Sequence, residues 1–170
     1  MQKLIKIKLI NWQSFIDNTI PVSGNILVTG ENGAGKSSML DALYFVLAGG
    51  SSKFNLAATD ETSRSVETYM RGTIGAEGRE CLRPSPNLIS HVALEFLDAN
   101  GSSLVLGCAL EIRDGAPKAD QAFYLIRNGH IQDELYFDID GEKKKVVNAK
   151  MLQDKSNAFF GERSFAAIKG

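Results

Sequence analysis

The chain has 170 residues, of which 44% are hydrophobic and 23% are charged, and its formal net charge at pH 7 is −1. A chain of this length and composition can form one globular domain with its own hydrophobic core. The near-zero net charge excludes a general electrostatic attraction to nucleic acid or to a membrane surface, so any contact with DNA has to come from a local cationic patch.

Further features indicate where the protein works. The longest apolar runs are shorter than a membrane span, and the first residues, Met-Gln-Lys-Leu-Ile-Lys, do not form the apolar segment of a secretory signal. The cysteines, Cys81 and Cys108, lack metal-ligand spacing, which indicates free thiols. We therefore expect a cytoplasmic protein without a membrane partner.

The first segment predicts a pair of β-strands. Residues 4–11 alternate between apolar and polar side chains, with Lys6 and Lys8 on the polar face, which is typical of a strand with one face in water. A turn follows, and residues 19–22 can return as a second strand.

A glycine-rich motif comes next. Residues 30–38 read Gly-Glu-Asn-Gly-Ala-Gly-Lys-Ser-Ser and fit the pattern G-x-x-x-x-G-K-[ST]. In this pattern the glycines let successive backbone N–H groups turn toward phosphate oxygens, the lysine reaches the β- and γ-phosphates, and the first hydroxyl binds Mg²⁺. Lys36 and Ser37 are the residues for these last two roles. An apolar strand over residues 25–29 and a helical pattern over residues 36–47 supply the expected strand-loop-helix context.

The motif predicts a binding site for ATP and Mg²⁺ at the start of this helix, whose positive end adds to the attraction for phosphate. Lys36 is the candidate catalytic residue, and Ser37 is the candidate metal ligand. The candidate nucleotide-binding residues are Gly30, Asn32, Gly33, Ala34, Gly35, Lys36, Ser37 and Ser38. The apolar side chains expected on the buried face of the helix are Met39, Leu40, Leu43, Val46 and Leu47.

The following segments are expected to be less regular. Small and polar residues from 49 to 64 predict a long loop, and loops of this length are usually functional or mobile. A short helix is expected over residues 65–71, ending at Gly72. The glycines and prolines of residues 72–88 argue against regular structure there.

Alternating apolar residues in the second half predict an antiparallel β-meander. The expected strands cover residues 90–97, 104–112, 122–127, 131–139 and 143–147, with Asn128-Gly129 as the strongest hairpin signal. The sequence thus predicts an α/β protein, with a P-loop NTPase core and an adjoining antiparallel β-meander. Residues 1–50 hold the first strands and the P-loop, 51–88 a loop-rich insertion, 89–147 the β subdomain, and 148–170 a weakly helical tail.

The sequence does not identify an acid that would complete a hydrolytic site. Such enzymes need a carboxylate at the end of a second apolar strand, where it holds Mg²⁺ and polarises water. Asp98 and Asp138 both follow apolar segments, but these segments alternate and run into turns. That pattern favours ordinary aspartates at polar turns.

Two stretches are informative together: residues 10–15, Ile-Asn-Trp-Gln-Ser-Phe, and residues 26–43, which contain the P-loop and end in Leu-Asp-Ala-Leu. They resemble the opening of SMC-type ATPase heads, including the SbcC and MukB groups. Residues 65–72, 82–84 and 94–96 are similar, more narrowly, to JetC, the SMC-like subunit of the Wadjet plasmid-defence systems.

The resemblance implies the N-terminal lobe of an ABC-type ATPase head that acts on DNA. In that family a C-terminal lobe, which follows a long coiled coil, supplies the Walker B acids and the signature motif, and ATP joins two heads. The expected partners are this C-terminal lobe, a second head, DNA, and kleisin-like and accessory subunits. A nucleoid-associated location is expected, and the isolated chain should bind ATP without hydrolysing it.

The resemblance also suggests roles for residues outside the P-loop. Arg71 corresponds to an arginine that lies near nucleotide and DNA, although a basic residue at a helix C-terminus is also favoured by the helix dipole. Independently of the resemblance, the near-zero net charge leaves DNA contact to local cationic positions, so Lys6 and Lys8 are further candidates, or else solvated lysines on a strand face. Gln153 is the nearest candidate for a metal-binding glutamine expected late in the lobe.

Two other interpretations remain open. A self-contained small-molecule phosphotransferase would need a lid rich in arginines, although a β-meander is not expected in such an enzyme. Its candidate arginines are Arg64, Arg71, Arg79 and Arg83. A transporter-type ABC subunit is disfavoured by the first strand, with Asn11-Trp12 and Phe15, and by the missing signature motif.

Overall fold

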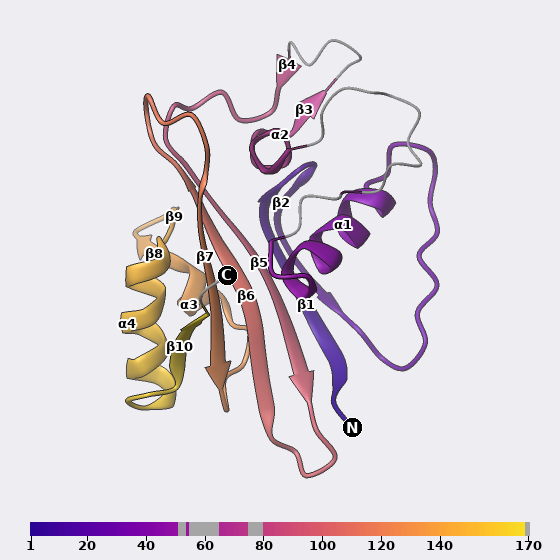
Figure 1. Ribbon diagram of the computed structural model, residues 1–170, viewed down its shortest axis with the longest axis vertical. Helices are drawn as coiled ribbons and strands as arrows, with labels where there is room; N and C mark the ends of the chain where they lie inside the picture. The colour runs from indigo at the N-terminus through magenta and orange to yellow at the C-terminus, as the bar shows by residue number, and fades with distance from the viewer. Residues whose placement is uncertain (51–53, 55–64, 75–79, 169–170) are drawn as a thin grey trace.

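The computed structural model describes residues 1–50, 54, 65–74 and 80–168. Its centre is a six-stranded sheet with the strand order β10-β7-β6-β5-β1-β2 (Figure 1). Its strands are β1 (Lys3–Trp12), β2 (Phe15–Pro21), β5 (Leu88–Leu97), β6 (Ser103–Ile112), β7 (Asp120–Arg127) and β10 (Phe165–Ile168). Two small sheets pair β3 (Thr73–Ile74) with β4 (Glu80–Cys81), and β8 (Phe137–Asp140) with β9 (Lys143–Val146). The helices are α1 (Lys36–Leu47), α2 (Val66–Arg71), α3 (Asp133–Tyr136) and α4 (Ala149–Phe160).

The central sheet joins segments that the sequence suggested were separate. β1 pairs with β2 on one side and with β5 on the other, so that Ile7 lies opposite both Ile20 and Leu94. The predicted β subdomain over residues 89–147 therefore does not stand beside the first strands, because both belong to one sheet. Every strand pair in the described residues is antiparallel.

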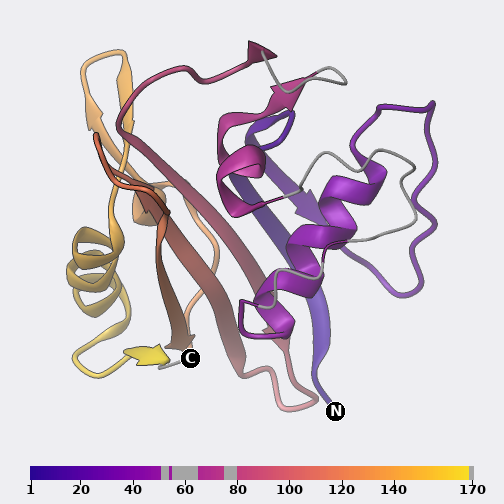
Figure 2. The same cartoon turned by 45° about the horizontal axis from the view of Figure 1, so that its top comes forward.

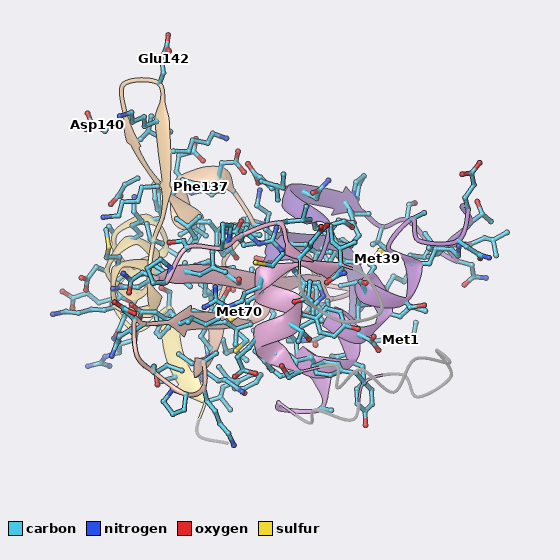
Figure 3. The ribbon with its side chains drawn as sticks, turned by 90° about the horizontal axis from the view of Figure 1, so that it is seen from above. Met1, Met39, Met70, Phe137, Asp140 and Glu142 are labelled. Atoms are coloured by element: carbon cyan, nitrogen blue, oxygen red, sulfur yellow. The ribbon has the colours of Figure 1, made fainter. Side chains whose placement is uncertain are left out.

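Helices cover both faces of the sheet (Figure 2). On one face, Met39 and Phe45 of α1 and Tyr69 of α2 pack in a core with sheet residues such as Leu9. On the other face, the core contains residues of α3 and α4, such as Leu152. Figure 3 shows that the β8–β9 hairpin projects from this second side. The predicted α/β class is thus confirmed, with an antiparallel sheet between two helical layers.

None of the helices in the described parts of the chain is both long and apolar enough to cross a membrane.

Local sequence signals predicted several elements correctly. The helix after the P-loop, the short helix before Gly72 and the strands β5, β6 and β7 all form where they were expected. Ser65 caps α2 by accepting a hydrogen bond from the Thr68 N–H, and Gly72 ends this helix with φ of 63°. These signals act within one helical turn, so the sequence alone is enough to find them.

Two predicted strands are wrong. Residues 25–29 form no strand, and Leu27 there is 87% exposed. A parallel strand has to be covered on both faces and paired along its edges, and none of the described strands pairs with this segment. Residues 131–139 do not pair back after the turn at Asn128, because the chain there forms α3 and begins β8.

The buried face of α1 matches the predicted one only in part: Met39 and Val46 are buried and Leu43 packs against the core, as expected, but Leu40 and Leu47 are exposed. Its buried residues are Met39, Asp41, Ala42, Phe45 and Val46, whereas Leu40, Tyr44 and Leu47 are 52%, 47% and 60% exposed. Apolar residues lie all round this helix, so periodicity alone does not decide which stripe meets the sheet. The ring of Phe45 packs against that of Trp12, with centroids 5.8 Å apart, and α1 keeps an apolar stripe on its outer side.

Candidate nucleotide-binding site

The P-loop leads directly into α1, and its turns require glycine. Gly33 and Gly35 have φ of 86° and 89°, which side-chain-bearing L-residues rarely adopt. A Cβ at Gly35 would also lie 3.2 Å from the Phe15 ring and from the Ser14 Oγ. At Gly33 a Cβ would meet open space within the described residues, so this glycine leaves room for a ligand to approach the backbone.

The start of α1 presents unpaired backbone donors. The first backbone hydrogen bond runs from the Met39 N–H to the Gly35 carbonyl oxygen, 2.9 Å away. The N–H groups of residues 36–38 therefore have no acceptor within the helix, and no side chain caps this end. An uncapped N-terminus of a helix this long attracts anions through its N–H groups and its dipole. These donors suit the phosphates of a nucleotide.

Lys36 folds back over the loop. Its Nζ donates to the carbonyl oxygens of Gly30 and Glu31, at 2.6 and 2.7 Å. These acceptors are neutral, whereas phosphate oxygens are anionic, so the ammonium would bind them more strongly. The lysine is thus held where it can exchange loop carbonyls for a phosphate, and the residues present fit a nucleotide.

The described residues fit a magnesium ion only in part. Ser37 is exposed at the start of α1, and its hydroxyl can serve as one ligand. However, no group of three or more His, Cys, Asp or Glu side chains is arranged to hold a metal in the described segments. Phosphate oxygens and water would have to supply the other ligands of an ion held here by Ser37.

Asp98 lies far from this site. It accepts hydrogen bonds from the N–H groups of Asn100 and Ser102 in the turn after β5. The adjacent Leu97 pairs with Lys3 at the start of β1, whereas the P-loop helix contacts the other end of β1. At about 3.3 Å per residue, the length of β1 separates the two places by about 30 Å. The interpretation of Asp98 as a turn aspartate is confirmed.

Asp138 and Gln153 lie on the opposite side of the sheet. Asp138 belongs to β8 and forms an ion pair with Lys155 of α4, 2.9 Å away. Gln153 is exposed on α4, which packs in the core opposite α1. The hypothesis that Gln153 is the metal-binding glutamine is therefore wrong, because the sheet separates it from Ser37.

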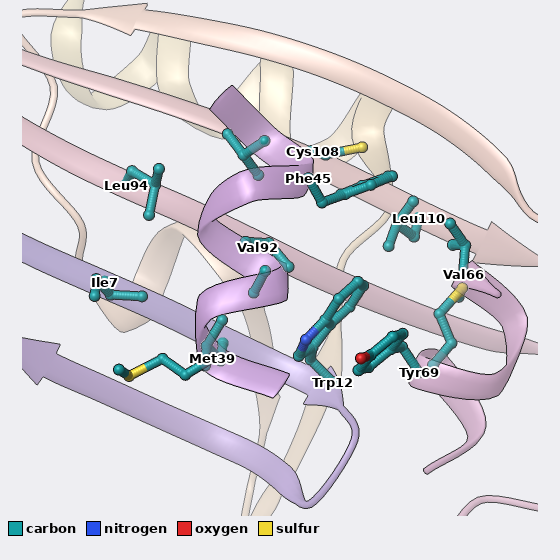
Figure 4. Close-up of a cluster of buried hydrophobic side chains, with 14 of the residues drawn as sticks. Ile7, Trp12, Met39, Phe45, Val66, Tyr69, Val92, Leu94, Cys108 and Leu110 are labelled. Carbon is teal, nitrogen blue, oxygen red and sulfur yellow. The ribbon is translucent and has the colours of Figure 1, made fainter. Parts of the chain in front are cut away.

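A group of residues that sequence analysis did not assign supports the P-loop (Figure 4). The Trp12 Nε1 donates to the carbonyl oxygen of Ser38, 2.8 Å away. The Tyr69 hydroxyl donates to Asp41, which is buried in the second turn of α1. The Trp12 and Tyr69 rings stack, with centroids 4.6 Å apart and planes 9° apart. The signal in the sequence was that Trp12 and Asp41 lie in the segments resembling SMC-type heads and Tyr69 in a stretch resembling JetC.

Arg71 ends α2, which is hydrogen-bonded to the turn between β1 and β2, and this turn lies against Gly35 of the P-loop. The Arg71 Nη1 donates to the carbonyl oxygen of Ser85, 2.9 Å away. Arg83 donates to the carbonyl oxygens of Met70 and Gln13, and burial lowers the pKa of its guanidinium. Both arginines thus hold backbone segments together. The other two arginines of the proposed lid, Arg64 and Arg79, lie outside the described residues.

The two lysines of β1 are less exposed to solvent than the prediction of a strand face in water implied. Lys8 is 1% exposed, and its Nζ lies 2.7 Å from carboxylate oxygens of both Asp17 and Asp133. It also donates to the Thr19 hydroxyl. The prediction of a solvated Lys8 is wrong because α3 and the β8–β9 hairpin cover this face, so Lys8 is not positioned to contact DNA.

Part of the Lys6 side chain is exposed to solvent. Its side chain is 31% exposed, and its Nζ lies 3.2 Å from Glu95. Burial alone would raise the pKa of Glu95, but hydrogen bonds from His130, the Ile131 N–H and Lys6 hold this pKa below its usual value. Glu95 therefore stays ionised and pairs with Lys6, whose side chain is still partly exposed to solvent.

Comparison with known proteins agrees with this geometry. Residues 4–61 match the family described as the P-loop containing region of AAA domain. The chain is also similar to the chromosome partition protein Smc of Methylococcus capsulatus, with 32% identity over 96 residues. The matched region covers 48% of this chain and 8% of that Smc protein, so the chain spans a small part of its relative's length. The chain thus contains a P-loop ATPase region that is similar to part of Smc.

Proposed function

We propose that this chain is the ATP-binding N-terminal lobe of an SMC-like ATPase head that acts on DNA. The observation that carries the proposal is the uncapped start of α1, where the N–H groups of residues 36–38 have no acceptor within the helix and the Lys36 ammonium lies on the carbonyl oxygens of the P-loop. The matches to a P-loop region and to Smc support it.

Each P-loop residue has a defined task in this proposal. The backbone N–H groups bind the phosphates, Lys36 balances the charge at the β- and γ-phosphates, and Ser37 offers its hydroxyl to the metal. A magnesium ion bound with ATP supplies neutralisation of charge between these phosphates. Asn32, Ala34 and Ser38 complete the loop around the nucleotide.

The exposed apolar surface supports the view that a second lobe completes the head. Leu40, Tyr44 and Leu47 form the outer stripe of α1, and Ile26 and Leu27 are exposed in the segment before the P-loop. Strand-like apolar residues without pairing partners are expected where another sheet is missing. A C-terminal lobe docked here would bring the acid and the signature residues that the described segments lack.

The finer proposal concerns the biological setting. The stretches over residues 65–72 and 82–84 are similar to JetC, so we place the protein in a Wadjet-type plasmid-defence complex with kleisin-like and accessory subunits. ATP would join two heads on DNA, in the cytoplasm at the nucleoid. Arg71 and the exposed part of Lys6 are the cationic positions offered to DNA.

A thermal-shift experiment with Lys36→Ala tests the nucleotide site. At a ligand concentration 100 times the Kd, binding stabilises a protein by about 2.7 kcal/mol, which corresponds to about 5 to 10 °C in Tm for a chain of this size. Mg-ATP should therefore raise the Tm of the parent chain and of Lys145→Ala, a control at an exposed lysine of β9. It should not raise that of Lys36→Ala. Equal shifts in all three proteins would refute the P-loop assignment.

A further inference from the structure

The start of α1 is fixed to its neighbours by two buried aromatic side chains. Trp12 is 0% and Tyr69 3% exposed, and their rings stack face to face. Trp12 donates to the carbonyl oxygen of Ser38, and Tyr69 donates to the Asp41 carboxylate. Both acceptors lie in the first two turns of α1, directly after the P-loop. Figure 4 shows the two rings between α1 and α2.

Hydrogen bonds also connect the chain next to Trp12 with the segment around Arg71. The Tyr69 carbonyl oxygen accepts a hydrogen bond from the Gln13 N–H, 2.6 Å away, and the Gln13 side chain donates to the Thr73 carbonyl oxygen, 3.1 Å away. The neighbouring Ser14 and Phe15 touch the position of a Cβ at Gly35. The P-loop, the turn between β1 and β2, and the end of α2 therefore form one connected block.

We propose that Tyr69 is a positioning residue for nucleotide binding. Its hydroxyl donates a hydrogen bond to Asp41, and its ring stacks on Trp12. These contacts keep the N-terminal turn of α1 in the orientation that presents its N–H groups to the phosphates. The inference rests on the proposed function of the P-loop as an ATP site. Because coupling between two sites is reciprocal, bound ATP then stabilises the segment from Tyr69 to Thr73 as much as this segment stabilises bound ATP.

The geometry explains why such support is needed. The outer stripe of α1 is uncovered and its N-terminus has no side-chain cap. The phosphate-binding N–H groups act together only if α1 keeps its place relative to the glycine turns, and displacements of about 1 Å in such sites cost much of their effect. The Tyr69–Asp41 hydrogen bond and the Trp12–Ser38 hydrogen bond fix the helix at the end where the phosphates would bind.

The test compares Tyr69→Phe with a matched control in the 170-residue chain. Tyr69→Phe keeps the ring stack and removes only the hydroxyl. Tyr124→Phe removes an equally buried hydroxyl from the core on the other face, where its neighbour is the Tyr136 hydroxyl and not a residue of α1. Titration with the fluorescent nucleotide methylanthraniloyl-ATP measures the affinity of each variant well below its Tm.

We expect Tyr69→Phe to weaken binding between about twofold and thirtyfold, the range for residues that carry coupling between sites. Tyr124→Phe should bind like the parent chain. Hydrogen exchange provides a second measurement that needs no variant: Mg-ATP should slow exchange in residues 66–74 of the parent chain. A merely structural hydroxyl would lower the Tm and leave both of these readouts unchanged.

The possible failures can be distinguished. Unchanged affinity of Tyr69→Phe, or unchanged exchange in residues 66–74 when the parent chain binds ATP, would overturn this inference alone. Absence of nucleotide binding by the parent chain would overturn the proposed function, and this inference with it.

Discussion

Substituting Lys8 by methionine removes the centre of a buried ion-pair network and should destabilise the fold. The ammonium of Lys8 lies 2.7 Å from both Asp17 and Asp133, while Lys144 lies 3.5 and 3.1 Å from the other oxygens of the same carboxylates. Methionine keeps the apolar stem of the side chain packed, so the substitution chiefly removes the charge.

The size of the effect follows from the exposure of the partners. Breaking a fully buried ion pair costs about 3 to 5 kcal/mol because a charge is left unpaired. The side chains of Asp17 and Asp133 are 30% and 45% exposed and keep Lys144, so water and this lysine reduce the loss. We therefore expect Lys8→Met to lower the free energy of unfolding by about 2 to 3 kcal/mol, or the Tm by about 4 to 12 °C.

Urea denaturation at neutral pH measures this loss, with Lys145→Met as the control on an exposed lysine. The pH dependence supplies a second check. The hydrogen bond from Lys8 lowers the pKa of Asp133 below its usual value, so its stabilisation is present above about pH 4 and is lost as the pH falls further. Lys8→Met should lose stability less steeply in this range. A destabilisation under about 0.5 kcal/mol, the range of ordinary surface substitutions, would refute the buried ion-pair network.

The remaining predictions concern DNA binding, the packing of α1 and the titration of His91. The chain should bind duplex DNA weakly and with a strong salt dependence. In a fluorescence anisotropy titration, Arg71→Ala or Lys6→Ala should weaken this DNA binding. Tight binding that survives high salt would contradict a local cationic contact. Phe45→Ala should cost about 3 to 5 kcal/mol in urea denaturation and Leu47→Ala less than about 1 kcal/mol, because Phe45 is 0% and Leu47 60% exposed; a reversed order would restore the helix face predicted from periodicity. Burial lowers the pKa of His91 from 6.5 to about 4, so the unfolded chain takes up a proton between these pH values that the folded chain does not, and stability should fall as the pH falls through this range. His91→Gln should flatten that slope, and an equally steep slope in the variant would show that other groups cause it.

The sequence was sufficient for features that depend on neighbouring residues. The pattern of Gly33, Gly35 and Lys36 identified the P-loop, because the required backbone angles and the lysine lie within a few residues of one another. Ser65 and Gly72 likewise bounded α2. In both cases the physical cause is a local backbone requirement that few residue types meet.

Features that depend on distant contacts were not predictable from one sequence. The face of α1 was predicted only in part, because apolar residues surround the helix and the sequence does not show that Phe45 packs against Trp12. Lys8 appeared solvated because its partner Asp133 lies 125 positions away. Tyr69 escaped notice as a partner of Asp41 for the same reason, since 28 positions separate them.

The strand expected before the P-loop has a different explanation. The apolar run over residues 25–29 has the composition of a buried strand, yet Leu27 is 87% exposed and none of the described strands pairs with it. An apolar composition is not sufficient for a strand, because a strand forms only where a neighbouring strand accepts its hydrogen bonds. A sheet contributed by a second lobe would supply that neighbour.

In the proposed function, this chain holds only half of a catalytic site. The most direct test of this proposal is to measure phosphate release by the chain at saturating Mg-ATP. The P-loop offers phosphate donors and one metal ligand, whereas Asp98 and Asp138 lie away from it, and positioning with charge stabilisation accounts for nearly all catalysis of phosphoryl transfer. The chain should therefore bind ATP and release phosphate at a rate that Lys36→Ala does not change. Turnover near about 1 per second, as in complete phosphoryl-transfer enzymes, that disappears in Lys36→Ala would contradict the half-site and show that the chain carries its own catalytic acid.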